Sequence, residues 1–193
     1  MNYKQLSVRF YSFALCAIKN MTAVVKGRQL ALAVIVAVVS TVAVAAVLTP
    51  SSGILSAPVF ARASFADRTD IRFKVGERRR GQEVINVNNA QETVMQQIVI
   101  APGGQTGWHS HPGPVVVLIK SGQMSFYDSE NRLGCTPRIY SAGEAFIDSG
   151  QGHVHLVRNE SQTENAEVWR TYFDVPPGGA TRIDALNPGN CSF

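Results

Sequence analysis

The sequence predicts an all-β domain that follows an N-terminal hydrophobic segment. After about residue 50, short stretches of alternating apolar and polar residues recur at intervals of about ten residues, separated by Gly and Pro. Residues 115–119 (VVVLI) form an apolar run rich in β-branched side chains, which is typical of a buried strand. No stretch of this region has a helical period. Many short strands of this kind indicate a β-sandwich or barrel.

The basic charge of the chain is concentrated at its N-terminus. The 193 residues carry a formal net charge of +4. Five of the 18 basic residues precede residue 30, and no acidic residue precedes Asp67. The other 13 basic residues stand against 14 acidic ones, so the rest of the chain is nearly neutral at −1. We therefore expect no nucleic-acid partner.

Residues 1–28 are predicted as a basic cytoplasmic region and residues 29–48 as a hydrophobic helix. The run LALAVIVAVVSTVAVAAVL is long enough to cross a bilayer, and the basic residues before it predict export of the remaining chain. Two interpretations stay open: an uncleaved signal anchor that holds the protein to the membrane, or a cleaved signal peptide. Both place the domain in the cell envelope or outside the cell. Residues 49–63, with Pro, Ser and Gly and no clear period, are predicted as a linker to a domain at 64–193.

Alternation and turn residues predict the strands of the domain in order. The candidate strands are residues 65–75, 83–88, 92–100, 115–119, 123–127, 138–140, 144–147, 153–158 and 166–175. The Pro-Gly-Gly sequence at 102–104 is expected to end the third of them, and residues 176–179 (PPGG) the last.

All four histidines lie in two short segments. His109 and His111 are two residues apart, and so are His153 and His155. In a strand, residues two apart point to the same face, so each pair would direct two imidazole rings into one space. Imidazole is a common metal ligand, and two facing strands with such pairs would form a site. The alternative is that buried histidines only form hydrogen bonds inside a barrel.

These two segments resemble the paired motifs of the cupin superfamily. The first motif, G-x5-H-x-H-x3-4-E-x6-G, is matched at Gly103, His109, His111 and Gly122, but Val115 stands at the glutamate position. The second motif, G-x5-P-x-G-x2-H-x3-N, is matched in its second half at Gly152, His155 and Asn159, whereas Gly150 replaces the proline and one extra residue separates it from Gly143. The motifs span residues 103–159.

The resemblance covers roughly residues 85–175 and extends to small exported bacterial cupins. It implies a double-stranded β-helix, or jelly-roll barrel, and pairing of two barrels into a homodimer. It also implies that His109, His111 and His155 are metal ligands. Val115 cannot bind metal, so a three-histidine site with open positions remains, as in the thiol dioxygenases. His153 is a further candidate ligand because it shares a strand face with His155.

Nitrogen ligands suit Fe, Zn, Cu or Ni, and the sequence does not choose between these divalent metals. Around the metal we expect a mostly apolar pocket for a small-molecule ligand. Its candidate lining residues are Trp108, Val115, Phe126 and Phe146. For each of them alone, a place in the ordinary core is the alternative.

A metal with open positions predicts oxygenase- or isomerase-type chemistry on a small organic molecule. The missing glutamate, and the lack of an obvious acid–base residue beside the site, favour a second interpretation. In that interpretation the domain is a non-catalytic module that binds a metal or a small ligand at the cell envelope. A third, purely structural role requires the histidines to be free of metal.

Three cysteines are present. Cys16 precedes the hydrophobic segment, so Cys135 and Cys191 are the pair left in the exported part. A disulfide between them would close a loop of about 56 residues and stabilise the domain by roughly 3–4 kcal/mol in the chain-entropy model. The alternatives are two free thiols, or Cys135 as a sulfur ligand.

Overall fold

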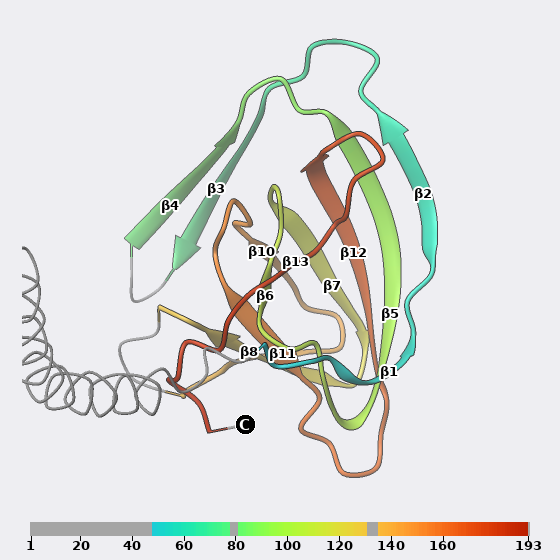
Figure 1. The fold of residues 1–193 in the computed structure, drawn as a ribbon, viewed down its shortest axis with the longest axis vertical. Helices are drawn as coiled ribbons and strands as arrows, with labels where there is room; N and C mark the ends of the chain where they lie inside the picture. Colours follow the sequence, from blue (N-terminus) through green and yellow to red (C-terminus); the bar gives the residue numbers. More distant parts are fainter. Residues whose placement is uncertain (1–47, 78–80, 131–134, 193) are drawn as a thin grey trace, which may run out of the picture. The chain divides into compact units, whose positions relative to one another are not determined.

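The computed structural model describes residues 48–77, 81–130 and 135–192. The predicted hydrophobic helix, apart from its last residue, lies outside the described residues, and so does Cys16. Among the residues that are described, no helix has the length and apolar character needed to span a bilayer. The described chain consists of strands and the loops that connect them (Figure 1).

The strands alternate with short turns along the whole domain. In chain order they are β1 (Ser52–Ser56), β2 (Val59–Ser64), β3 (Ile71–Glu77), β4 (Gly81–Val87), β5 (Glu92–Gln105), β6 (His109–Ser110), β7 (Val115–Ser121), β8 (Gln123–Asp128), β9 (Arg138–Ser141), β10 (Ala145–Asp148), β11 (His155–Arg158), β12 (Ala166–Val175) and β13 (Ile183–Asp184). Each strand predicted from residue 83 onward is present, with ends shifted by a few residues.

An 11-stranded antiparallel sheet, in the order β10-β7-β12-β5-β11-β6-β13, curls into a nearly closed barrel. On one side, β12 lies between β5 and β7, and β2 extends this side beyond β5 (Figure 1). On the other side, β11 lies between β6 and β8, and β9 follows β8. The long strand β5 joins the two sides, because its last residue, Gln105, pairs with Arg158 of β11.

The core fills the inside of this barrel. Along β12 the inward positions are fully buried and alternate with half-buried ones, as expected for one face of a sheet. The inward residues of β5, β7, β8, β11 and β12 form one apolar cluster: Val94, Ile98, Ile100, Val115, Val117, Ile119, Met124, Phe126, Val157, Ala166, Val168, Tyr172 and Val175. The prediction of an all-β barrel is therefore confirmed.

Residues 49–63, which we predicted as a linker, instead contain the edge strands β1 and β2. Both strands pair with β5. The sequence shows no alternation here because every residue of β2 is exposed. In β1, only Ile54 is half-buried against the core. Backbone pairing with the free edge of β5 creates these strands, so side-chain alternation is not needed.

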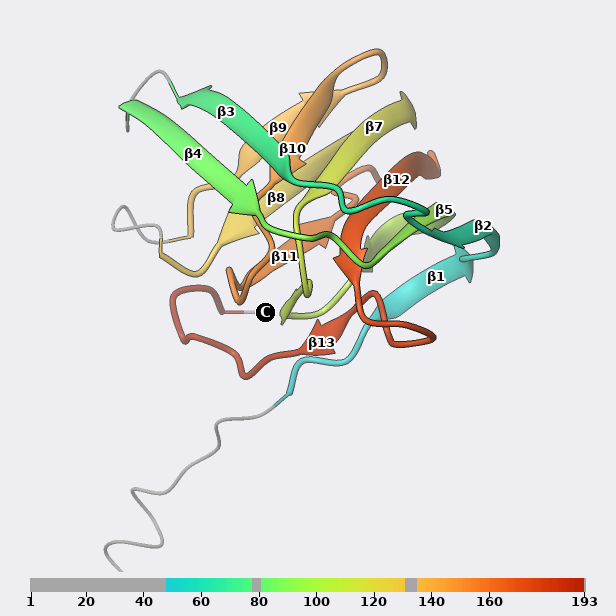
Figure 2. The same cartoon turned by 90° about the horizontal axis from the view of Figure 1, so that it is seen from above.

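Strands β3 and β4 form a separate two-stranded ribbon that crosses one end of the barrel (Figure 2). Phe73 on this ribbon contacts Phe173, with 5.6 Å between ring centroids. The side-chain amide of Gln151 donates a hydrogen bond to the carbonyl of Asn86 at 3.0 Å. The ribbon is thereby attached to the turn between β10 and β11, which borders the histidine cluster.

The structure contains the predicted disulfide between Cys135 and Cys191, whose Cα atoms lie 4.9 Å apart. Cys191 is buried in a second apolar cluster with Trp108, Tyr127 and Leu156. The bond ties the C-terminal tail to the side of the barrel formed by β6, β8 and β11. A disulfide of this kind is typical of proteins from oxidising compartments.

Candidate metal centre

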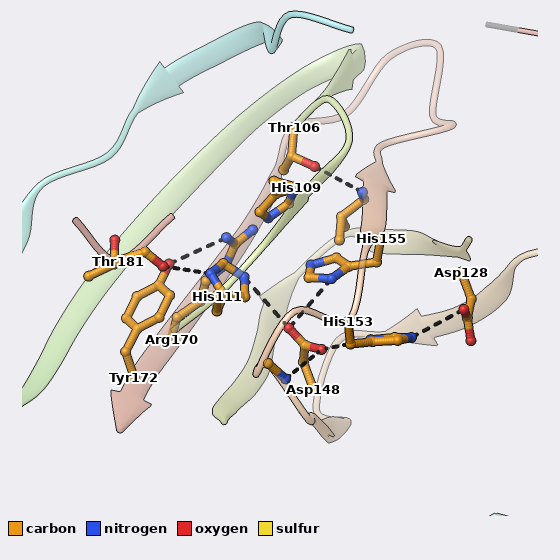
Figure 3. Close-up of polar contacts among 12 residues, drawn as sticks. Thr106, His109, His111, Asp128, Asp148, His153, His155, Arg170, Tyr172 and Thr181 are labelled. Atoms are coloured by element: carbon orange, nitrogen blue, oxygen red, sulfur yellow. Dashed lines mark hydrogen bonds and ion pairs between the residues drawn. The ribbon is translucent and has the colours of Figure 1, made fainter. Parts of the chain in front are cut away.

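Three of the four histidines meet inside the barrel. His109 lies on β6 and His155 on β11, where the two residues are direct Cα partners across the strands. His111 follows β6 immediately. One ring nitrogen from each of the three residues lies within 4.8 Å of the others, and all three side chains are buried (Figure 3). Opposed strands with inward histidines therefore produce the predicted cluster.

Backbone carbonyls determine the tautomer of two of these rings. Nδ1 of His109 lies 2.9 Å from the carbonyl oxygen of Gly107, and Nδ1 of His111 lies 2.6 Å from that of Thr181. A carbonyl only accepts hydrogen bonds, so both Nδ1 atoms carry the proton. The Nε2 lone pairs are therefore free, which is the arrangement of metal-bound histidines with a carbonyl behind the ring. Nε2 of His109 is buried and has no hydrogen-bond partner.

A buried carboxylate faces the same cluster. Asp148, the last residue of β10, has a side chain that is only 1% exposed. Its Oδ2 lies 3.6 Å from Nε2 of His111 and 3.5 Å from Nδ1 of His155. Neither this oxygen nor Nδ1 of His155 has a hydrogen-bond partner. The carboxylate of Asp148 thus lies beside two of the three clustered imidazoles, those of His111 and His155.

The fourth histidine, His153, contacts two carboxylates, and its ring is stacked on that of His155 with 6.0 Å between centroids. Nδ1 of His153 lies 3.2 Å from Oδ1 of Asp148, and its Nε2 lies 3.1 Å from Oδ1 of Asp128 (Figure 3). A carboxylate on each side makes both nitrogens donors, so the ring has no free lone pair. In this geometry His153 contacts Asp148; our prediction of His153 as a further ligand stays a prediction, because Asp148, His153 and His155 form a second group of side chains that could hold a metal ion.

The turn after Asp148 depends on Gly150. Its φ is +59°, and a side chain there would collide with the carbonyl of Gly113. The Gly150 amide donates a hydrogen bond to Oδ1 of Asp148 at 3.3 Å. Close packing at this turn therefore helps to aim the second carboxylate oxygen, Oδ2, at the cluster.

The barrel of two antiparallel sides, with the histidines of both sequence motifs joined inside it, decides the architecture. The domain has a cupin fold. No protein-family model matches the sequence, and no curated protein is significantly similar to it.

Solved structures similar to this chain include polyketide cyclase RemF from Streptomyces resistomycificus, at 15% identity and a TM-score of 0.40 over 51% of this chain and 63% of the cyclase. A double-stranded β-helix protein from Klebsiella pneumoniae matches at 17% identity and a TM-score of 0.40 over 66% and 92%. An oxalate oxidase matches at 25% identity and a TM-score of 0.36 over 42% and 41%. The chain spans less than two thirds of the cyclase and of the oxidase. Likenesses of this extent carry no activity over to the cupin domain.

Burial keeps the three clustered imidazoles neutral. It lowers the pKa of His109 well below its usual 6.5. Burial, followed by the neighbouring His155, lowers the pKa of His111 to about 3. The pKa of His155 falls to about 4, again mainly through burial, although Asp148 opposes the shift. A neutral imidazole is the form that binds a metal, so the cluster is ready to bind at neutral pH.

Asp148 and His153 are both charged. Burial alone would raise the pKa of Asp148, but the surrounding histidines, led by His155 and His153, outweigh it and hold this pKa below its usual value. Burial alone would lower the pKa of His153, but hydrogen bonds to Asp128 and Asp148 outweigh it and raise the pKa to about 10. His153 is therefore an imidazolium between two carboxylates at neutral pH.

A small cavity lies beside the cluster, with room for about one water molecule. Its polar lining comes from His111, Asp148, His155 and Arg170, and its apolar lining includes Phe126 and Phe146. These two aromatic residues were predicted to line the pocket.

The other two predicted pocket residues lie elsewhere. Trp108 belongs to the second apolar cluster, because it directly precedes His109 and so points to the opposite face. Val115 is fully buried in the main core and is not part of the cavity lining.

Asp148 and Arg170 are the residues of this site that sequence reasoning missed. The signal for Asp148 was its distance of two positions from Phe146, which places both on one strand face. The signal for Arg170 was the inward row of β12, in which it lies between Val168 and Tyr172.

Proposed function

We propose that the cupin domain binds one divalent transition metal ion through His109, His111, His155 and Asp148 and acts on a small organic molecule beside it. The observation that best supports this is a set of buried atoms without hydrogen-bond partners on side chains in or beside the histidine cluster: His109 Nε2, His155 Nδ1 and Asp148 Oδ2. Each such atom costs about 1–3 kcal/mol of stability when it stays unsatisfied. A cation among them removes this cost.

The donor set of three imidazoles and one carboxylate fits Fe, Zn, Cu or Ni. When bound with exchangeable positions, such an ion supplies Lewis-acid chemistry, or redox chemistry in the case of Fe or Cu. Oxygenase- or isomerase-type reactions are the classes we propose.

The chain itself orients the ligands and excludes water. The Phe126 ring stacks on His155 at 4.7 Å between centroids and holds that imidazole in place. The carbonyls of Gly107 and Thr181 keep the Nδ1 protons of the other two rings in place. The buried setting of the cluster keeps bulk water away, which strengthens polar interactions with a bound molecule.

The alternative function is a module that holds a metal or a small ligand without turnover. The small size of the cavity favours it, because little space exists for a substrate in this conformation. An enzyme would turn over a small organic molecule when loaded with metal, and the His155→Ala variant would lose this turnover. Such a result would favour the enzyme over the binding module.

We also propose that this domain works in the cell envelope or outside the cell, held by its N-terminal helix or released after cleavage. The disulfide between Cys135 and Cys191 supports an oxidising compartment. Protease protection of the domain in intact cells would test it: cleavage by added protease supports export, and full protection counts against it.

Calorimetric titration of the chelator-treated full-length protein with Zn²⁺ and Ni²⁺ tests the metal centre. We expect about one equivalent bound by the wild type and a loss of binding in His109→Ala and His155→Ala. The matched control is Leu156→Val, because Leu156 is the fully buried neighbour of His155 on β11 and belongs to the other apolar cluster. Unchanged binding in both histidine variants would contradict the proposal.

A further inference from the structure

Arg170 is a buried cation inside the barrel with no carboxylate partner among the described residues. It is 5% exposed. Its only side-chain hydrogen bond in the described part of the chain is a long one, 3.4 Å, from Nη1 to the Tyr172 hydroxyl oxygen. Its Nε is buried and has no partner. A guanidinium stays charged at all accessible pH values, so its burial is unfavourable unless an anion compensates it.

The compensating anion has a place to bind. Arg170 lines the same cavity as His111, Asp148 and His155 (Figure 3). The remaining lining is apolar. Among the described residues, Asp148 and Asp128 are the carboxylates beside the cluster: each contacts His153, and Oδ2 of Asp148 faces His111 and His155, but neither carboxylate forms an ion pair with Arg170. An anion bound at Arg170 would therefore have to come from outside the domain.

The net charge of the metal-bound site also favours an anionic ligand. The buried charges of Arg170 and His153 balance those of Asp148 and Asp128. A divalent ion at the histidine cluster adds two positive charges that no further buried acid offsets. A low-dielectric interior makes such an excess unfavourable, and an anionic ligand reduces it.

We infer that the molecule bound at this centre is a small organic anion with a carboxylate group, which pairs with Arg170 in the cavity beside the histidine cluster. The planar fork of a guanidinium matches a carboxylate in two parallel hydrogen bonds. The cavity has room for about one water molecule, so we expect formate, the smallest carboxylate, to bind best. This inference rests on the proposed metal centre and adds the chemical class of its ligand.

The test is a titration of the Co²⁺-loaded full-length protein, followed by the visible absorption of the metal. The probes are formate, acetate and butyrate, with acetamide as the neutral isostere of acetate and nitrate as a planar inorganic anion. We expect saturable spectral changes with formate and acetate, weaker binding of butyrate, and none with acetamide. A response to nitrate but to no carboxylate would overturn the inference.

Variants assign the effect to Arg170. Arg170→Met should weaken acetate binding about tenfold or more, as expected for the loss of a charge-assisted pair. Arg170→Lys keeps the positive charge but loses the planar guanidinium, so we expect an intermediate affinity for acetate. This variant replaces Arg170→Met in the test if the Met variant does not fold. Arg68→Met, which removes an exposed arginine, is the control for net charge and should leave acetate binding unchanged.

Metal content measured on the same samples separates the two proposals. Full metal with equal acetate affinity in the wild type, Arg170→Met and Arg170→Lys overturns the inference alone. A wild-type protein that takes up no metal overturns the metal centre and the inference with it.

Discussion

Asp148 lies directly opposite Val115, its Cα partner on the neighbouring antiparallel strand. Val115 stands at the position where the first cupin motif has glutamate. Directly opposed residues of an antiparallel pair point to the same face of the sheet. The carboxylate that is missing from β7 is therefore present on β10, where its Oδ2 approaches His111 and His155.

Replacement of the carboxylate should weaken metal binding. We predict that Asp148→Asn, which keeps the shape and removes the charge, lowers metal affinity by about 10- to 100-fold. Competition with a chromophoric chelator measures this change. Asp70→Asn, on the exposed Asp70, is the control. An Asp148→Asn protein with wild-type affinity would show that the three histidines alone hold the ion.

The imidazolium of His153 should stabilise the metal-free protein in a pH-dependent way. Its folded pKa of about 10 lies above the unfolded value of 6.5. The stabilisation is thus fully present below pH 6.5 and is lost as the pH rises toward 10. We expect the gap in unfolding free energy between the wild type and His153→Gln, measured by urea denaturation, to narrow from pH 6 to pH 10. A constant gap over this range would contradict the ion-pair assignment.

The clustered imidazoles should make the metal-free protein less stable as the pH falls below 6.5, which is the opposite pH dependence to that of His153. The pKa of His155 is about 4 when folded and 6.5 when unfolded. Between these values the unfolded chain binds a proton that the folded state rejects, so stability falls as the pH drops from 6.5 toward 4. We expect His155→Asn, measured without metal, to show a shallower fall in melting temperature over this interval. Parallel curves for the two proteins would place the titration elsewhere.

The disulfide should contribute stability without affecting the metal. We predict that the double variant Cys135→Ser, Cys191→Ser lowers the free energy of unfolding by about 2–4 kcal/mol. The bond ties down the tail on the outer side of the β6–β8–β11 sheet, away from the barrel interior. Metal content should therefore stay unchanged in the folded variant. A loss of metal at temperatures where the variant stays folded would show that the tail supports the site.

The fold and the three histidines were predictable because both depend on local patterns. Alternation places His109 and Phe126 on inner faces, and the spacing of His109 and His111 directs both rings into one interior, where His155 meets them. The edge strand β2 was not predictable, since none of its side chains is buried and the strand is defined by backbone pairing with β5.

The carboxylate and the arginine of the site depend on register. Asp148 reads as an ordinary turn residue until the pairing of β10 with β7 places it opposite Val115. Arg170 shares one face of β12 with Val168 and Tyr172, but only the closure of the barrel shows that this face is the buried one. Which strand pairs with which is set by the tertiary structure, and one sequence does not reveal it.

The metal content of the purified protein shows whether the buried histidine cluster is a metal centre. The full-length protein would be purified without added metal and without a histidine tag, and analysed by mass spectrometry beside His109→Ala and His155→Ala. We expect about one equivalent of Fe, Zn, Cu or Ni in the wild type and its loss in both variants. No metal in the wild type, and none taken up on titration, would contradict it.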